Sequence, residues 1–285
     1  MKDVLITGCS TGIGRATALH LDNRGFRVFA GVRKQEDGEK LAADASGGLI
    51  PLIVDVADDD SVAACARQLS VECPGGLAGL VNNAGISVYG PMETVPIDEL
   101  RRQLEVNVVG QVAMTQANLP LLRKAKGRIV FISSVAGRTH SMPFFGPYAA
   151  SKWAIEAIGD ALRVELAAWG IKVAIIEPGA IESAIWAKGF EEFDEVVERM
   201  SSETRPTYEP AMKQGLKIFQ MLVRHGRPGT VVAKKIEHAL TARRPRTRYV
   251  IGPDARFQVS GNFMPDRLRD KVMARSLRIT GRRPH

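Results

Sequence analysis

Short apolar runs alternate along the chain with longer stretches in which apolar residues recur at helical spacing. The short runs are typical of buried β-strands, and the longer stretches are typical of amphipathic helices. Strands are predicted near residues 3–7, 26–32, 49–55, 77–82, 127–132 and 171–176. Helices are predicted near residues 13–24, 36–45, 59–72, 97–118 and 148–168, with several more after 183. This alternation predicts an α/β fold, a doubly wound parallel sheet with helices on both faces.

The region after residue 183 departs from this regular alternation. Proline and glycine cluster at 206–215 and 226–229, and we interpret both clusters as loops that bound an inserted helical segment. Segment 184–226 is longer than a simple connection, so we expect it to form a helical flap over the substrate. The chain of 285 residues otherwise fits a single domain, 1–285, without an internal repeat.

Composition narrows the class of protein. With 45% hydrophobic and 25% charged residues, the chain is typical of globular proteins. No apolar run reaches about 18 residues, and the N-terminus enters a strand at once, so neither a membrane-spanning helix nor a signal peptide is expected. The three cysteines Cys9, Cys65 and Cys73 fit a reducing compartment, and the five histidines lack ligand spacing. We therefore expect a cytoplasmic protein without a catalytic metal.

The positive charge is concentrated at one end of the chain. The net charge is +8, and the basic C-terminal segment, residues 243–285, holds twelve Arg or Lys and three Asp. Residues 1–242 therefore carry a net charge near −1. The segment fits a solvated surface, an anionic substrate or peripheral contact with a membrane. It contains no nucleic-acid-binding motif, so no nucleic-acid partner is predicted.

A glycine-rich turn follows the first predicted strand. Residues 7–14 read Thr-Gly-Cys-Ser-Thr-Gly-Ile-Gly, and an amphipathic helix follows them. Glycines let the backbone approach a pyrophosphate, and the helix N-terminus offers free N–H groups and a positive dipole end. The spacing Gly-x3-Gly-x-Gly differs from the commonest dinucleotide fingerprint, but strand, turn and helix together predict a phosphate cradle.

Further polar or turn residues stand where later strands end. Asp55 ends the third strand, Asn82–Gly85 ends the fourth, Ser133 and Ser134 end the fifth, and Pro178–Gly179 ends the sixth. Ligands of open parallel sheets bind at the carboxyl ends of the strands. The sequence therefore predicts that these residues line one cleft with the glycine turn.

Tyr148 and Lys152 stand four residues apart in a predicted helix and therefore share one face. A free phenol titrates near a pKa of about 10, too high for a good base at neutral pH. We expect the Lys152 ammonium to favour the phenolate and lower that pKa. Such a tyrosine takes a proton from an alcohol or gives one to a ketone.

Together these motifs resemble the short-chain dehydrogenase/reductase family. The matching segments are 7–14, Asp55–Val56, 82–85, Asn107 in Val-Asn-Val-Val-Gly, 132–134, 148–152 and 178–183, which cover roughly residues 3–183. Segment 245–256 is similar to the subset of the family that acts on steroids, retinoids and hydroxybutyrate. The resemblance implies a Rossmann fold, a nicotinamide cofactor and hydride transfer.

The resemblance also implies a role for each catalytic residue. Tyr148 is the general acid/base, and Lys152 lowers its pKa and binds the nicotinamide ribose. Ser134 positions the substrate oxygen, and Asn107 holds a water that links Lys152 to solvent. Ser134 lies fourteen residues before Tyr148, one more than the commonest family spacing, so we expect the loop 135–147 to bulge.

Cofactor residues follow from the same motifs. The expected set is Gly8, Ser10, Thr11, Gly12, Ile13, Gly14, Arg33, Asp55, Val56, Asn83, Ala84, Gly85, Tyr148, Lys152, Pro178, Gly179, Ile181 and Ser183. An acid at the end of the second strand favours NAD, but Arg33 stands there, and a guanidinium pairs well with a 2′-phosphate. We therefore predict NADP over NAD, although the glycine turn adds no second basic residue before Gly12.

The predicted substrate walls are apolar and aromatic, which indicates a bulky hydrophobic alcohol or ketone. They comprise Val88–Met92, Met142–Phe145, Ile185, Trp186, Phe190 and Phe193. Two alternatives stay open: a reductase of an anionic 3-oxoacyl thioester, and a regulatory protein that senses NADP without turnover. The family often pairs its two long helices across an interface, so a homodimer or homotetramer is expected.

Overall fold

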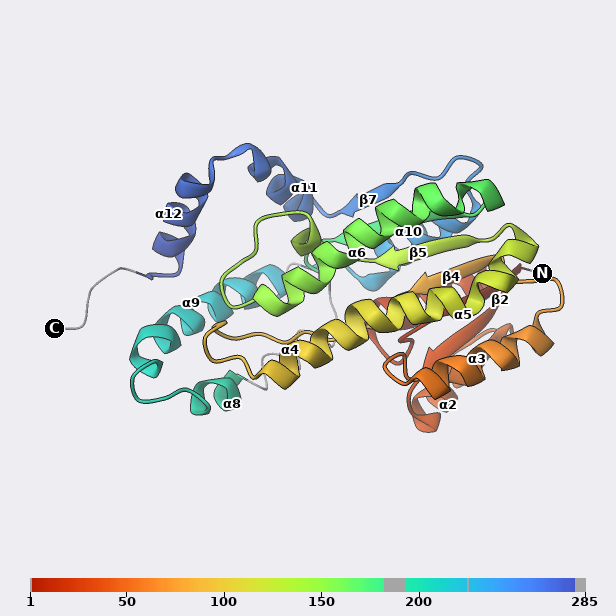
Figure 1. Ribbon diagram of the computed structural model, residues 1–285, viewed down its shortest axis with the longest axis horizontal. Helices are drawn as coiled ribbons and strands as arrows, with labels where there is room; N and C mark the ends of the chain where they lie inside the picture. Colours follow the sequence, from red (N-terminus) through yellow and green to blue (C-terminus); the bar gives the residue numbers. More distant parts are fainter. Residues whose placement is uncertain (1, 182–192, 225, 280–285) are drawn as a thin grey trace.

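The computed structural model of the protein describes residues 2–181, 193–224 and 226–279. Within them, seven strands form one sheet in the order β3-β2-β1-β4-β5-β6-β7, and all neighbouring pairs are parallel (Figure 1). The strands are β1 (Lys2–Ile6), β2 (Phe26–Val32), β3 (Leu49–Ile53), β4 (Gly79–Asn82), β5 (Arg128–Ile132), β6 (Lys172–Pro178) and β7 (Arg248–Ile251). The predicted doubly wound parallel sheet and its six strands are confirmed.

The seventh strand was not predicted. β7 pairs with β6 over four residues, from Ile175 opposite Arg248 to Pro178 opposite Ile251. The sequence Arg-Tyr-Val-Ile is short and follows a basic stretch, so it lacks the apolar length that reveals the inner strands. Part of the basic C-terminal segment is therefore built into the sheet.

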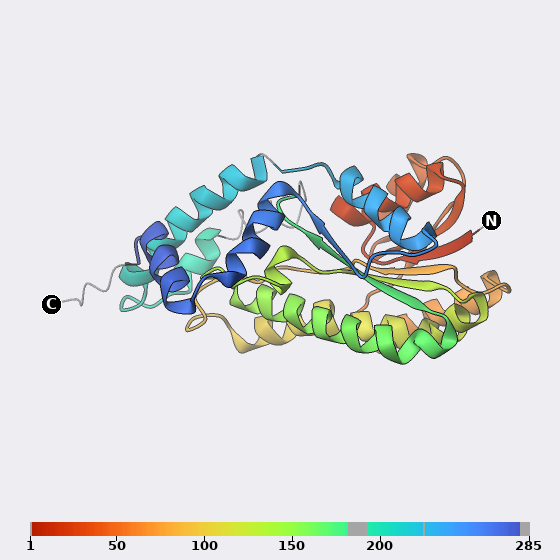
Figure 2. The same cartoon turned by 90° about the horizontal axis from the view of Figure 1, so that it is seen from above.

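Helices cover both faces of the sheet, as Figure 2 shows from above. α1 (Gly12–Asn23), α2 (Gln35–Ala43) and α10 (Gly229–Thr241) contribute to one core layer. α3 (Asp59–Glu72), α5 (Gly110–Ala125) and α6 (Gly146–Glu165) contribute to the other. Leu21 and Ile236 are fully buried in the first layer, and Leu69 and Met114 in the second. Each such side chain stabilises the fold by about 1.5–3 kcal/mol. Because both faces are covered, the inner strands carry runs of buried apolar residues, such as Val4, Leu5 and Ile6 of β1.

The region after residue 192 forms helices beside the carboxyl edge of the sheet. α8 (Phe193–Glu198) and α9 (Arg205–Arg224) share a small core with Tyr89 and Phe144. The helices predicted after residue 183 are therefore present in the part described, and the role of this segment as a substrate flap stays a prediction. The loop predicted at 206–215 is wrong, since α9 runs through it. Pro206 sits at the start of α9, where no backbone donor is needed, and the buried Met212 anchors the helix beyond Pro210.

The last helices are α11 (Pro253–Ser260) and α12 (Asp266–Ser276), and α12 lies beside α9 in both views. None of the described helices combines the length and apolar character needed to cross a bilayer. Exposed apolar side chains on or next to α5 and α6 include Val109, Trp153 and Val164. The predicted homodimer or homotetramer stays a prediction.

Candidate active site

A cleft runs along the carboxyl ends of the strands, where the loops after β1, β2, β3, β4, β5 and β6 meet. It brings together all the predicted cofactor residues that the structure describes, together with Ser134. Ser183 lies outside the described residues, as do Ile185, Trp186 and Phe190. Asn107 lies behind the cleft wall and not on its surface.

The turn between β1 and α1 is shaped by close backbone approach. Gly8 and Gly12 have positive φ values of 70° and 57°, which favour glycine. A Cβ on Gly14 would lie 2.1 Å from the Gly8 carbonyl oxygen. α1 begins at Gly12, so its first N–H groups have no partner within the helix and face the turn. This cradle fits the pyrophosphate of a dinucleotide.

Asn83 fastens the loop after β4 to the cradle. Its Nδ2 donates to the carbonyl oxygens of Thr7 and Gly8, at 2.8 and 3.0 Å. In return, the Thr7 hydroxyl accepts the backbone N–H groups of Asn83 and Ala84, both at 3.0 Å. The cofactor cleft is therefore held open by four hydrogen bonds across two neighbouring strands.

Tyr148 lies in the first turn of α6 with its side chain buried. The expected lowering of its pKa is wrong for this state of the protein. Burial raises the pKa of the Tyr148 phenol to about 12, and a hydrogen bond with Ser134 opposes the rise only in part. The cost of desolvating the phenolate is the largest cause of this shift. At neutral pH the phenol therefore carries its proton.

Lys152 follows one helical turn later and is buried as well. Its Nζ donates to the Ile132 carbonyl oxygen at 2.8 Å and lies 5.6 Å from the centroid of the Tyr148 ring. Burial lowers the pKa of the Lys152 ammonium to about 8, and the Glu156 carboxylate opposes this shift. An ammonium has three donors, so two remain for ligands in the cleft.

Burial of Lys152 predicts a stability gain on its removal. At pH 7 the lysine is charged in both states, and only the folded state bears the desolvation cost, so Lys152→Met should be more stable by on the order of 1–3 kcal/mol. Between pH 8 and 10.5 the unfolded chain binds a proton that the folded chain does not, so wild-type stability gains with pH. The advantage of Lys152→Met should therefore shrink across that window. Urea unfolding at pH 7 and at pH 10 measures the difference in unfolding free energy between Lys152→Met and the wild type, with the exposed Lys40→Met as control. If this difference were the same at both pH values, the lowered pKa of Lys152 would be contradicted.

The two serines after β5 have different surroundings. Ser134 forms the hydrogen bond with Tyr148, and its Oγ also accepts from the Ala136 backbone N–H at 3.2 Å. Ser133 Oγ is buried without a hydrogen-bond partner, next to Gly137. Of the two serines, Ser134 is therefore the one that is hydrogen-bonded to Tyr148.

Asn107 lies in a π-helical turn, Glu105–Val109, that joins α4 (Ile97–Leu104) to α5. The helix predicted at 97–118 is thus one helix interrupted by this turn and extended to residue 125. The Asn107 amide donates to the Ile86 carbonyl at 3.0 Å and to Ser151 Oγ at 3.1 Å. Its Oδ1 accepts the Ile86 N–H at 2.8 Å. Both N–H donors of the Asn107 side chain are therefore used within the protein, and its role in holding a water stays a prediction.

Two further buried amides support the same loop and were missed by the sequence analysis. Gln103 accepts the Val88 N–H at 2.6 Å and donates to the Ile86 carbonyl at 3.0 Å. Gln111 donates to the Ala84 carbonyl at 3.0 Å. With Asn107 they form a row at intervals of four residues, and this i, i+4, i+8 spacing was the signal that was available.

At the other end of the cleft lie charged residues after β2. Arg33 lines the cleft as predicted, and the neighbouring Lys34 lines it too. Asp37, in the first turn of α2, also lines it. Lys34 and Asp37 were not among the predicted site residues.

The family model described as short chain dehydrogenase matches residues 2–193. The chain belongs to the short-chain dehydrogenase family. It is 40% identical to the 17-beta-hydroxysteroid dehydrogenase type 6 of Bos taurus, over 96% of this chain and 88% of that protein. It is 37% identical to the NADPH-dependent 3-dehydrocapnine reductase of Ornithobacterium rhinotracheale, over 98% of each chain.

A further relative and a solved structure support the same family. Retinol dehydrogenase 16 of Homo sapiens is 39% identical over 95% of this chain and 87% of that protein. A solved short-chain dehydrogenase from Streptomyces avermitilis has a TM-score of 0.77 and 29% identity, over 95% of this chain and 94% of that one. The chain is thus an NAD(P)-dependent oxidoreductase related to steroid and retinol dehydrogenases, and the sensor without turnover is set aside.

The substrate end of this dehydrogenase differs from the predicted walls. Val88 and Tyr89 line the cleft, but Phe144 and Phe193 pack into the core of the flap. Phe145 stacks on Tyr89 and contacts Phe219. Apolar or aromatic character alone does not separate a substrate wall from a lid core. Charged residues that were not predicted also line this end: Glu99, Arg102, Glu195 and Arg199.

Proposed function

We propose that this dehydrogenase transfers a hydride between NADP(H) and a hydrophobic secondary alcohol or ketone. The observation that carries the proposal is the buried Tyr148 phenol, which is hydrogen-bonded to Ser134 in a cleft that also holds Lys152. When bound, the nicotinamide supplies or accepts the hydride. Tyr148 then moves the proton: it protonates the oxygen of a ketone, or takes the proton of an alcohol.

The neighbouring residues hold atoms in place for that proton transfer. Ser134 donates to the substrate oxygen and stabilises its developing charge. The free donors of Lys152 bind the ribose hydroxyls, and Asn107 holds the water that connects Lys152 to solvent. Burial keeps the Tyr148 phenol protonated at neutral pH, so the phenol can act as the acid in ketone reduction. Alcohol oxidation needs the phenolate as base and should therefore become faster as the pH rises.

Support for NADP comes from two basic side chains in the cleft, Arg33 and Lys34. A dinucleotide held by the glycine cradle would have its adenosine ribose near the end of β2, where these residues lie. The relative with 37% identity is named an NADPH-dependent reductase. Asp37 places a negative charge on the same wall of the cleft. It repels a 2′-phosphate and should therefore weaken the preference for NADP over NAD.

Support for a hydrophobic substrate comes from Ile86, Val88, Tyr89 and Val196, which line the cleft beside Tyr148. The relatives with 40% and 39% identity are named for hydroxysteroids and retinol. A rigid apolar ligand loses little entropy on binding, so such walls favour steroid- or retinoid-like alcohols.

A substrate panel tests this proposal. Purified enzyme is assayed with hydroxysteroids, retinol, short hydroxy acids and long-chain ketones, each with NADP(H) and NAD(H). We expect at least about 100-fold higher kcat/KM for a steroid or retinoid than for a short hydroxy acid, since several buried CH₂ groups separate them. Equal rates across the panel would contradict an apolar substrate site.

A second candidate rests on Arg102 and Arg199, two guanidiniums at the substrate end. They favour the alternative substrate, an anionic 3-oxoacyl thioester, although Glu99 and Glu195 line the same region. A 3-oxoacyl thioester in the panel decides between the two. The cytoplasmic location and membrane contact by the basic C-terminal segment stay predictions.

A further inference from the structure

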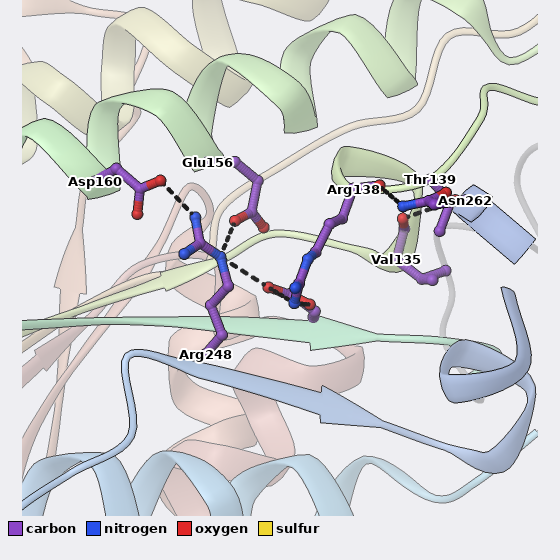
Figure 3. A network of polar contacts seen from close by, with 8 residues as sticks. Val135, Arg138, Thr139, Glu156, Asp160, Arg248 and Asn262 are labelled. Carbon is purple, nitrogen blue, oxygen red and sulfur yellow. Dashed lines mark hydrogen bonds and ion pairs between the residues drawn. The ribbon is translucent and has the colours of Figure 1, made fainter. Parts of the chain in front are cut away.

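One arginine of the basic C-terminal segment is drawn into the interior beside the active site. The Arg248 side chain on β7 is 25% exposed and contacts three carboxylates. Its Nε lies 2.9 Å from Glu156 and 3.2 Å from Glu177, and its Nη2 lies 2.7 Å from Asp160. Figure 3 shows the guanidinium between α6, which carries Glu156 and Asp160, and the strands below.

The contacts reach the turn that carries Ser134. Glu177 is fully buried at the end of β6, and its carboxylate accepts from Arg138 Nη1 at 3.1 and 3.3 Å. Arg138 ends the short helical turn Val135–Gly137, for which Ser134 is the N-cap. Asn262 donates to the Arg138 carbonyl oxygen at 2.7 Å, also visible in Figure 3. One ion-pair network therefore connects α6, which carries Lys152, with the turn that follows Ser134.

The charges of this network balance. Among the described residues, the charged groups of this network are Glu156, Asp160 and Arg163 on α6, together with Arg138, Glu177 and Arg248. Glu156 also acts on Lys152, which lies one turn before it on α6, beyond Tyr148. Three carboxylates face three guanidiniums. Burial raises the pKa of Glu177, and the neighbouring Glu156 adds to the rise, so removal of either guanidinium partner leaves an uncompensated negative charge.

We propose that Arg248 is a positioning residue for the reaction, because it neutralises the carboxylate that stands one helical turn beyond Lys152. It acts through Glu156, whose field reaches the ammonium of Lys152, and through Glu177, which anchors the Ser134 turn by way of Arg138. The catalytic role of Tyr148 and Lys152 rests on the proposed function. The dependence of the Lys152 pKa on Arg248 does not.

Two substitutions should shift the active site in opposite directions. Arg248→Met adds net negative charge and should raise the pKa of both Lys152 and Tyr148. Glu156→Gln removes negative charge and should lower both. The shifts should be on the order of half to one pH unit. Simple disruption of packing would not reverse sign between the two variants.

The first measurement is an NMR titration of the Lys152 side chain in ¹³C-lysine-labelled protein, with the signal assigned from Lys152→Met. It tests the inference without any turnover. The second is the pH profile of alcohol oxidation, whose apparent pKa should rise in Arg248→Met and fall in Glu156→Gln. If the titrations shift and the wild type has no dehydrogenase activity, the proposed function fails, while the dependence of the Lys152 pKa on Arg248 stands.

Controls separate charge from structure. Arg248→Lys keeps the charge and should restore both profiles. Arg27→Met removes an arginine of β2 with a similar exposure of 29%, which pairs with Glu72 at the end of α3. It should cost stability but leave both profiles unchanged. Unshifted profiles, or shifts of the same sign in Arg248→Met and Glu156→Gln, would overturn the proposal. If Arg248→Met does not fold, the sign of the Glu156→Gln shift decides alone.

Discussion

Replacing Tyr148 by phenylalanine should reduce turnover by about 10³-fold or more, because the reaction then lacks its positioned proton donor. The ring fills the same buried space, so the fold should survive. The cofactor cradle is built from Gly8, Gly14 and Asn83 and does not use the phenol oxygen. Cofactor affinity should therefore stay within about twofold. Steady-state kinetics and a fluorescence titration with NADPH measure the two effects.

The matched control is Tyr249→Phe. Tyr249 is 5% exposed and Tyr148 is 7% exposed, so the two tyrosines are similarly buried. The Tyr249 hydroxyl accepts from the Arg246 N–H and bonds His238 Nδ1 at 2.8 Å, away from the cleft lining. This variant should lose about 1 kcal/mol of stability and keep its turnover. If Tyr148→Phe retained a tenth of wild-type activity, another group would have to be the acid/base.

Arg33→Asp should move the cofactor preference from NADP toward NAD by about 100-fold in the ratio of kcat/KM values. The substitution removes a partner of the 2′-phosphate and adds a charge that repels it. It also creates an acid at the end of β2 that can accept the ribose 2′-hydroxyl. Lys34 remains in the cleft, so NADP binding should weaken without being lost.

Lys40→Asp is the control for Arg33→Asp. Lys40 lies in the last turn of α2, is exposed and does not line the cleft. The variant makes the same change of charge near the site without the contact, and its NADPH to NADH ratio should match the wild type. An unchanged ratio in Arg33→Asp would show that this position does not read the phosphate.

The inner strands were predictable because a sheet covered on both faces demands continuous apolar runs. β7 was not, because an edge strand of four residues buries only alternate side chains. The loop expected at 206–215 failed for a related reason. Proline and glycine lower helix propensity locally, but burial of Met212 and packing of Tyr208 on the flap core outweigh it.

The predicted cofactor residues that the structure describes lie in one cleft, because parallel strands bring their carboxyl ends to one edge of the sheet. What the sequence could not predict is how deeply each side chain is buried. The direction of the Tyr148 pKa shift depends on how completely the phenol is buried, and that is set by residues from several elements. The partners of Arg248 lie 88 and 92 positions away on α6, so no local pattern announces them.

The place of β7 in the sheet has a consequence for biosynthesis. The residues predicted to cradle the cofactor leave the ribosome well before Arg248 does. Until Arg248 has been synthesised, Glu177 lacks one of its two guanidinium partners, and the sheet ends at β6. A nascent chain or an early-terminated product thus holds a formed nucleotide half and an unfinished catalytic half, with an apolar sheet edge open to chaperones and proteases.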